Sequence, residues 1–218
     1  MEVTYTCDCG STFVGTVYHA VNVTLEPQLL YTLLSGRLNT ATCHNCGRQA
    51  TSSLPFLYHD MRRGLFAYVH PRADLDEEER DDILEQLRHT YSRAVQISER
   101  ISPPRSAQRT PSGLSNRDHP AGVSEPDAPP MQVIFGVDRL VALVESLLEP
   151  EERLGHVALN TASHDATARE RLVRVAGRIA AELGCQIDAR EHLGTFTVEI
   201  YGSRKRISQL VSMLHSAT

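Results

Sequence analysis

Two short cysteine motifs, each ending in Cys-Gly, constrain the fold of this chain more than any other feature. They are Thr6-Cys7-Asp8-Cys9-Gly10 and Thr42-Cys43-His44-Asn45-Cys46-Gly47. A glycine directly after the second cysteine tolerates the backbone conformation that a tight turn around a metal ion demands. If the flanking strands bring the two turns together, four thiolates surround one tetrahedral zinc ion at about 2.3 Å each. The sequence therefore predicts a structural zinc site built from Cys7, Cys9, Cys43 and Cys46.

The unequal spacing of the two motifs leaves alternatives to zinc open. The first pair is Cys-x-Cys, one residue shorter than the Cys-x-x-Cys of the second pair. The thiols could instead pack without a metal, or Cys43 and Cys46 could form a redox dithiol, although no thioredoxin-like βαβ pattern surrounds them. His44 could replace a cysteine that the shorter turn misplaces. A catalytic zinc is not expected, because it needs an open coordination position and four cysteines fill the sphere.

The N-terminus and the composition are typical of an intracellular protein. Residues 1–6 contain no basic segment and no apolar run, so they are not expected to form a signal peptide. The apolar stretches are too short to cross a bilayer, and no membrane contact is expected. The predicted localisation is cytoplasmic, where a reducing environment favours metal-bound cysteines over disulfides. The net charge of −5 gives no overall positive field for nucleic acid.

Composition divides the chain into four segments, which together predict an α+β fold. Residues 1–72 hold most of the cysteines and are expected to form a β-rich, zinc-ribbon-like domain with a short helix. Residues 73–101 form a charged amphipathic helix with an acidic first turn. Residues 102–130 are rich in Pro, Ser, Arg and Asp and are expected to be a disordered linker. Residues 131–218 alternate strand and helix, as expected for a separate two-layer α/β domain.

Turn and cap residues predict where the elements begin and end. Thr24 is the expected N-cap of the short helix, Gly36 is its C-terminal stop, and Asp138 is the expected cap of the first C-terminal helix. Residues 61–64 are the expected turn of a β-hairpin. Helix 166–183 is expected to stop at Gly184, and its apolar face is predicted to consist of Leu172, Val175, Ile179 and Leu183. Further strands are expected at 132–135, 156–161, 185–191 and 195–201, the last two joined by a turn at 193–194, with a closing helix over 204–215.

Further motifs accompany the cysteines between Cys7 and Pro71. Cys-Gly-Ser-Thr-Phe begins at Cys9, Leu-Ser-Gly-Arg-Leu-Asn occupies 34–39, Pro-Phe-Leu-Tyr-His-Asp occupies 55–60 and Val-His-Pro ends at 71. In this combination the stretch resembles the CpXC domain, a bacterial and archaeal domain of uncharacterised function named for a Cys-Pro-x-Cys motif. The resemblance implies zinc binding by the same four cysteines and implies no reaction. The first pair departs from the family pattern, because it lacks both the proline and one spacer residue.

Other sequence features give little indication of catalysis or of nucleic-acid binding. The chain contains no Gly-x-Ser-x-Gly elbow, no His-Glu-x-x-His and no glycine-rich phosphate loop. His59 and Asp60 are neighbours on a predicted strand and point to opposite faces, so they are not expected to form a relay. Arg62-Arg63 and Arg204-Lys205-Arg206 are small basic patches that are expected to be solvated. Cys185 has no partner in the sequence and is expected to be a small buried apolar residue.

The sequence therefore favours a non-catalytic adaptor or regulatory protein, in which a zinc-stapled domain and an α/β module mediate protein–protein interactions. A long linker between two modules lets both engage partners without fixing their geometry. The expected partner is a protein whose identity the sequence does not give. The alternative is a zinc-ribbon nucleic-acid-binding or transcription-associated factor, which salt-dependent binding to DNA or RNA would distinguish.

Overall fold

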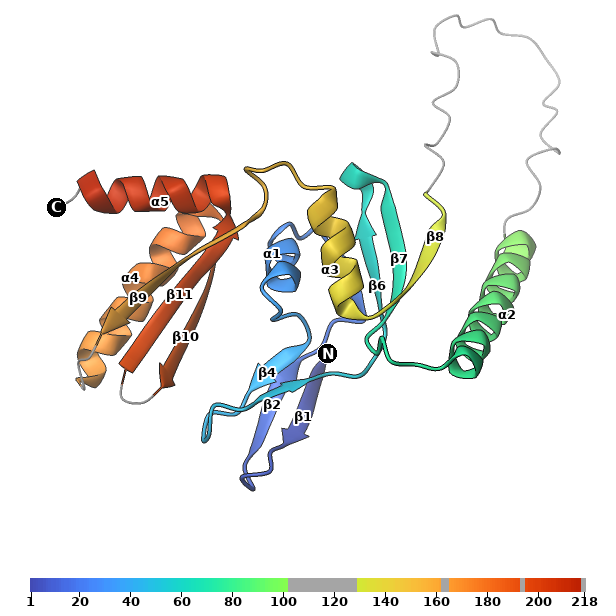
Figure 1. Cartoon of the computed structure of the whole chain (residues 1–218), viewed down its shortest axis with the longest axis horizontal. Coiled ribbons are helices and arrows are strands. Elements are labelled where there is room, and N and C mark those ends of the chain that lie inside the picture. Colours follow the sequence, from blue (N-terminus) through green and yellow to red (C-terminus); the bar gives the residue numbers. More distant parts are fainter. Residues whose placement is uncertain (102–128, 162–164, 193–194, 217–218) are drawn as a thin grey trace, which may run out of the picture. The chain divides into compact units, whose positions relative to one another are not determined.

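The computed structural model describes residues 1–101, 129–161, 165–192 and 195–216. The described residues form two compact units, one from Met1–Ala73 with Pro129–Thr218 and one from Asp74–Ala128. Figure 1 labels the elements along the chain. The strands of the first unit are β1 (Glu2–Thr6), β2 (Thr12–Thr16), β3 (Ala20–Asn22), β4 (Thr40–Thr42), β5 (Gln49–Thr51), β6 (Phe56–Asp60), β7 (Leu65–His70), β8 (Met131–Phe135), β9 (Leu154–Thr161), β10 (Gln186–His192) and β11 (Thr195–Ser203). Its helices are α1 (Gln28–Leu34), the 3-10 turn η1 (Met61–Arg63), α3 (Val137–Ser146), α4 (Ala166–Leu183) and α5 (Arg204–Ser216).

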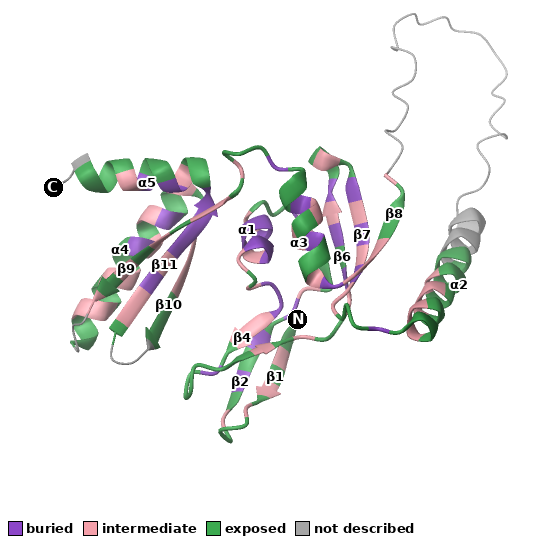
Figure 2. Ribbon diagram, in the orientation of Figure 1, coloured by how far each residue is buried: buried purple, intermediate pink, exposed green. Residues whose placement is uncertain are grey.

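A four-stranded sheet in the order β3-β6-β7-β8 is the frame of the first unit. β6 and β7 pair antiparallel around η1, which confirms the predicted hairpin, while β3 runs parallel to β6. β8 is added parallel to β7, from Phe66 opposite Met131 to His70 opposite Phe135. Side chains of the sheet pack with α1 and α3 into the larger apolar core. Figure 2 shows buried residues along α1, α3, β6 and β7 in purple. Its fully buried members include Val21, Leu33, Tyr58, Val69, Leu140 and Val144.

A second sheet in the order β10-β11-β9 is antiparallel and carries α4 and α5. Its apolar core consists of Ala176, Ala180, Val198, Ile200, Ile207 and Leu210. The prediction that Val175 belongs to the buried face of α4 is wrong, because Val175 is 50% exposed. The helix is rotated so that the small residues Ala176 and Ala180 face the strands. Cys185, predicted to be buried, packs against this core but is only partly buried.

The two sheets belong to one unit because α1 and the residues after it contact β11. The guanidinium of Arg37 stacks on the ring of Tyr201, 4.5 Å from its centroid, and pairs with Glu199 and with Asp188 at 3.3 Å. Tyr201 is itself part of the larger core. The N-terminal segment and the C-terminal strands therefore share buried side chains.

The domain division predicted from composition stays a prediction, but the described contacts differ from it in one respect. The strand expected to open a separate domain at 132–135 is β8, which completes the sheet of the N-terminal segment. A parallel neighbour satisfies the hydrogen-bonding groups along one edge of β7, which a self-contained 1–72 domain would leave unpaired. The predicted mixed α+β fold is confirmed. Residues 102–128 of the predicted linker and the turn predicted at 193–194 lie outside the described residues.

The second unit contains α2 (Glu77–Ile101), the predicted amphipathic helix. Its start has the reciprocal bonds of a capping box: the Glu79 backbone N–H donates to Asp76 Oδ1 at 2.8 Å, and the Asp76 N–H donates to Glu79 Oε2 at 3.1 Å. Glu77, Glu78 and Glu79 place negative charge at the positive end of the helix dipole. Neither α2 nor any other helix in the described ranges combines the length and the apolar character needed to span a bilayer.

Two of the predicted helix starts are wrong, whereas both predicted stops are confirmed. α1 begins after Pro27, and the hydroxyl of Thr24 instead accepts from the Met61 backbone N–H at 3.0 Å. Asp138 lies within the first turn of α3, which begins after Gly136. Thr24 could cap a helix, but its hydroxyl is bonded to the β6–β7 turn. Asp138 could do so as well, but it lies inside the first turn of its helix. Gly36, which follows the C-cap residue Ser35 of α1, and Gly184, the C-cap residue of α4, both adopt the left-handed conformation.

The strand pairs β1–β2 and β4–β5 form two short ribbons that approach each other closely at Gly15. A Cβ atom at Gly15 would lie 2.5 Å from the Cβ of Ala41 and 3.0 Å from the ring of Tyr5. Real Cβ atoms essentially never make contacts this short, so only glycine permits the observed packing of β2 against β4. This contact brings the ends of the ribbons, and the cysteines that follow them, into proximity.

We expect Gly15→Ala to lower the free energy of unfolding by about 1–3 kcal/mol, because the added methyl group forces the two ribbons apart. Urea unfolding followed by far-UV circular dichroism measures the change. Gly177→Ala is the matched control, since its Cβ would meet only Ile187 Cδ1 at an ordinary 3.5 Å. In helix α4 this change should be neutral or stabilising. Equal stability of Gly15→Ala and the parent chain would show that the ribbons do not need this close contact.

Candidate metal centre

The four cysteines of the two motifs lie in the turns at the ends of the two ribbons. The last residues paired across β1–β2 are Thr6 and Thr12, and those across β4–β5 are Thr42 and Gln49. The first turn therefore consists of residues 7–11 and the second of residues 43–48. A backbone hydrogen bond closes the base of each turn. The Cys7 N–H donates to the Ser11 carbonyl at 2.9 Å, and the Cys43 N–H donates to the Arg48 carbonyl at 2.7 Å.

The first motif, which is one residue shorter than the second, forms a tighter turn. The Gly10 N–H donates to the Cys7 carbonyl three residues earlier, at 2.9 Å, whereas the Gly47 N–H donates to the Cys43 carbonyl four residues earlier, at 2.8 Å. Both glycines have positive φ, 86° for Gly10 and 74° for Gly47, which L side chains adopt only under strain. A Cys-x-Cys and a Cys-x-x-Cys turn therefore end in the same backbone conformation.

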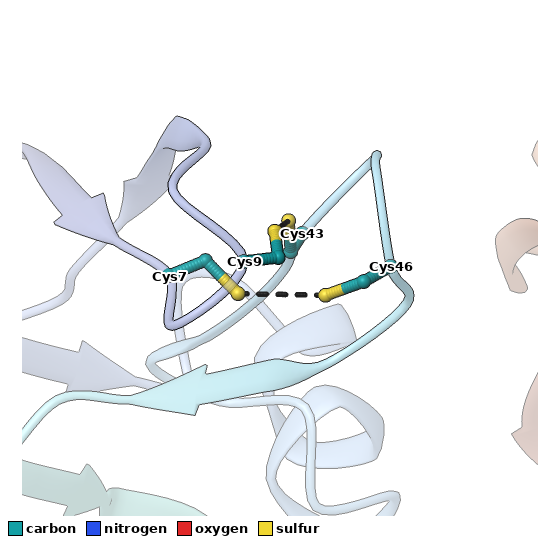
Figure 3. Close-up of side chains that lie close together, drawn as sticks. All are labelled: Cys7, Cys9, Cys43 and Cys46. Atoms are coloured by element: carbon teal, nitrogen blue, oxygen red, sulfur yellow. Dashed lines mark hydrogen bonds between the residues drawn. The ribbon is translucent and has the colours of Figure 1, made fainter.

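The turns bring the four sulfur atoms into one cluster (Figure 3). Cys7 Sγ lies 3.4 Å from Cys46 Sγ, and Cys9 Sγ lies 3.7 Å from Cys43 Sγ. All four sulfurs lie within 4.8 Å of one another. These separations exceed the 2.0 Å of a disulfide bond, and all five cysteines of the chain are free thiols.

The cluster has the size and the chemistry of a metal site. A tetrahedral ion about 2.3 Å from each sulfur holds the sulfurs about 3.8 Å apart, close to the observed pairs. Cys43 is buried, whereas Cys9 and Cys46 are exposed at the surface. His44 is exposed and is not part of the cluster. The four sequence-predicted residues therefore form a group that could hold a metal ion, and neither His44 nor Cys185 joins it.

Hydrogen bonds give the sulfurs different acidities. The Asn45 amide donates to Cys9 Sγ at 3.5 Å and, together with the backbone of Ser11, lowers the pKa of Cys9 to about 5. Cys9 is then a thiolate at neutral pH, which is the form that binds metals. A backbone hydrogen bond from Cys9 lowers the pKa of Cys7, but the sulfur contacts with Cys46, Cys9 and Cys43 outweigh it and raise the pKa to about 12. Metal binding therefore releases protons, and acid opposes it.

An ion pair also joins the two turns. Arg48 in the second turn donates to Asp8 in the first at 2.7 Å. Both side chains are largely exposed, so the pair contributes at most about 1 kcal/mol to stability. Surface charge therefore contributes little to holding the turns together, compared with the close packing of the ribbons at Gly15.

The neighbouring pair His59 and Asp60 does not form a relay, as the sequence predicts. Asp60 is 1% exposed and accepts hydrogen bonds from both the backbone and the guanidinium of Arg63, while the ring of His59 stands edge-on to Phe66. Arg63 also pairs with Glu152 at 2.8 Å. Sequence reasoning missed this buried network, because nothing in the order of residues indicates that Glu152 lies beside the β6–β7 turn.

Comparison with known families matches residues 5–114 to a family described as CpXC protein. The chain belongs to the CpXC family. Neither the curated proteins nor the solved structures contained a match. The resemblance predicted from the sequence is confirmed, and this CpXC chain keeps the four-cysteine cluster despite its shortened first motif. The match ends at residue 114, so β8 to α5 lie outside it although β8 completes the CpXC sheet.

Purified without chelator, the CpXC chain should contain about one metal ion per molecule, which we expect to be zinc. Cys43→Ser and Cys46→Ser should each reduce this content to near zero, because three sulfurs hold zinc far more weakly than four. Elemental analysis by plasma mass spectrometry measures it, with Cys185→Ser as the matched control that should retain the metal. Metal-free protein in which the N-terminal thiols all titrate freely in the native state would contradict the assignment.

Proposed function

We propose that this CpXC chain is a non-catalytic adaptor or regulatory protein, in which a structural zinc ion bound by Cys7, Cys9, Cys43 and Cys46 fixes the ribbons and α2 docks a partner protein. The observation that carries the docking role is the apolar stripe of α2, in which Leu84 and Leu87 are half-buried and Tyr91 is exposed. Leu84, Leu87 and Tyr91 recur at helical spacing, and Tyr91 is 66% exposed.

The choice of zinc rests on the donor set. Thiolates favour zinc, copper(I) and iron–sulfur clusters over calcium and magnesium, and a tetrahedral set of four sulfurs is typical of zinc or iron–sulfur sites. Four protein ligands leave no coordination position for substrate or water, which supports a structural role. The metal then stabilises the ribbons without taking part in a reaction.

The proposed partner is a protein with an apolar groove that has basic residues along its rim. An amphipathic helix binds such a groove through residues spaced by three, four and seven positions, which is the spacing of Leu84, Leu87 and Tyr91. The acidic first turn of α2, at Glu77, Glu78 and Glu79, would face the basic rim and would speed association by electrostatic steering.

Leu87→Asp with Tyr91→Asp should abolish partner binding, because two charges replace the apolar contact. The matched control is Gln86→Asp with Thr90→Asp, which adds the same charges to exposed positions on another face of α2. Tagged full-length chains expressed in the source cell are captured in parallel, and the bound proteins are quantified by mass spectrometry. We expect specific proteins to be lost with the first pair of changes and kept with the second.

Equal capture by both double variants would contradict docking through α2. Capture that disappears on nuclease treatment, or that falls steeply with salt for both variants alike, would instead support the nucleic-acid-binding alternative. Circular dichroism of both variants separates loss of the helix from loss of the contact.

A further inference from the structure

Two basic patches that are far apart in the sequence line one cavity in the first unit. The cavity has a volume of about 280 Å³ and lies between η1 after β6 and the start of α5. Arg62 and Arg63 contribute one side, and Lys205 and Arg206 contribute the other. The sequence suggested separate solvated patches, whereas the fold makes them walls of the same site.

Only some of these charges are engaged by other groups. Arg63 pairs with Asp60 at 2.7 Å and with Glu152 at 2.8 Å, and Arg206 donates to the Gly184 carbonyl at 2.8 Å. Arg62 and Lys205 form no side-chain ion pair within the described ranges. Both are exposed at the edge of the cavity, so they are available to a ligand.

The acidic residues of the wall do not cancel its positive charge. Glu151 and Glu152 also line the cavity, and Asp60 pairs with Arg63 from behind the wall, so four cationic side chains are opposed by three carboxylates. The hydrogen bond from Arg63, with a contribution from the charge of Arg62, lowers the pKa of Glu152, which shows that this carboxylate already has its counter-charges. The N-terminus of the 13-residue helix α5 adds the positive end of a helix dipole.

The remaining wall offers neutral hydrogen-bond donors. Tyr31 and Ser203 line the cavity, and both side chains are buried. Their hydroxyls bond to each other, which leaves one of the two hydroxyl protons for a ligand. Burial raises the pKa of Tyr31, so its hydroxyl keeps its proton at neutral pH. Val23, Pro27 and Leu30 supply apolar walls. Buried hydroxyls and free cations around a small space are the composition of a polar ligand site.

We propose that this cavity binds a small phosphate-bearing anion, with Arg62 and Lys205 pairing with its oxygens at the mouth and with Arg206 and the Tyr31–Ser203 hydroxyl pair donating from inside. A phosphate group carries close to two negative charges at neutral pH, and Arg62 and Lys205, which form no ion pair within the described ranges, can pair with them at the mouth. Arginine in particular recognises phosphate through parallel N–H bonds. The volume is at the lower limit of ligand pockets, about 300 Å³, and therefore fits a small metabolite.

Isothermal titration of the full-length, metal-loaded chain with inorganic phosphate and with pyrophosphate, at constant ionic strength, tests the proposal. We expect saturable binding of one ligand, and Arg62→Gln and Lys205→Gln should each weaken it about tenfold, as expected for loss of one charged hydrogen bond. Arg204→Gln is the matched control: it removes the same charge one residue away, from an exposed side chain outside the cavity. It should leave the affinity unchanged.

Glu151→Gln should change the phosphate affinity in the opposite direction. It removes a carboxylate from the wall and should tighten phosphate binding severalfold, whereas Glu149→Gln, outside the cavity, should not. Absence of saturable heat with either phosphate probe would overturn the proposal, as would an equal loss of affinity in Arg204→Gln. Tighter binding of citrate than of pyrophosphate would show that the site selects carboxylates and that phosphate is the wrong class.

Discussion

Most buried apolar side chains of the described chain gather in two clusters, and neither cluster extends into the ribbons β1–β2 and β4–β5. Within the ribbons, burial is limited to a few side chains such as Phe13, which stacks on Tyr5. A two-stranded ribbon without a core is marginally stable at best in water. The ribbons meet at Gly15, where the backbone comes too close for any other residue, and at the four sulfurs. A metal ion bound there would supply folding free energy where burial supplies little, since ligands from two distant turns are gathered only in the folded state.

The parallel pairing of β7 with β8 joins the CpXC segment to residues that the family match does not include. Arg37, stacked on Tyr201 and paired with Glu199, links the same segments on the other side of α1. The C-terminal half is therefore part of the frame that supports the CpXC ribbons. The cavity between η1 and α5 is lined by residues from both the CpXC segment and the C-terminal half. Membership of the CpXC family therefore does not by itself predict what this cavity binds.

Local features of the fold could be predicted from the sequence, and long-range partners could not. The cysteine spacing predicted which four sulfurs converge, and Gly36 and Gly184 predicted where helices end, because each depends on a few adjacent residues. The pairing of β8 with β7 and the pairing of Arg63 with Glu152 join residues separated by dozens of positions, and hydrophobic periodicity carries no information on such partners. Thr24 had the right chemistry for an N-cap, but its hydroxyl is used by the β6–β7 hairpin instead.

Amide hydrogen exchange of the full-length chain, with and without a strong chelator, tests most directly whether the cysteine cluster is a metal staple of the ribbons. Exchange reports the stability of each segment separately, so the ribbons and the cores can be compared in one experiment. Removal of the metal should increase exchange throughout β1, β2, β4 and β5, whereas β6 and β7, which the larger core holds, should remain protected. Unchanged protection of the ribbons after elemental analysis has confirmed metal loss would contradict the account.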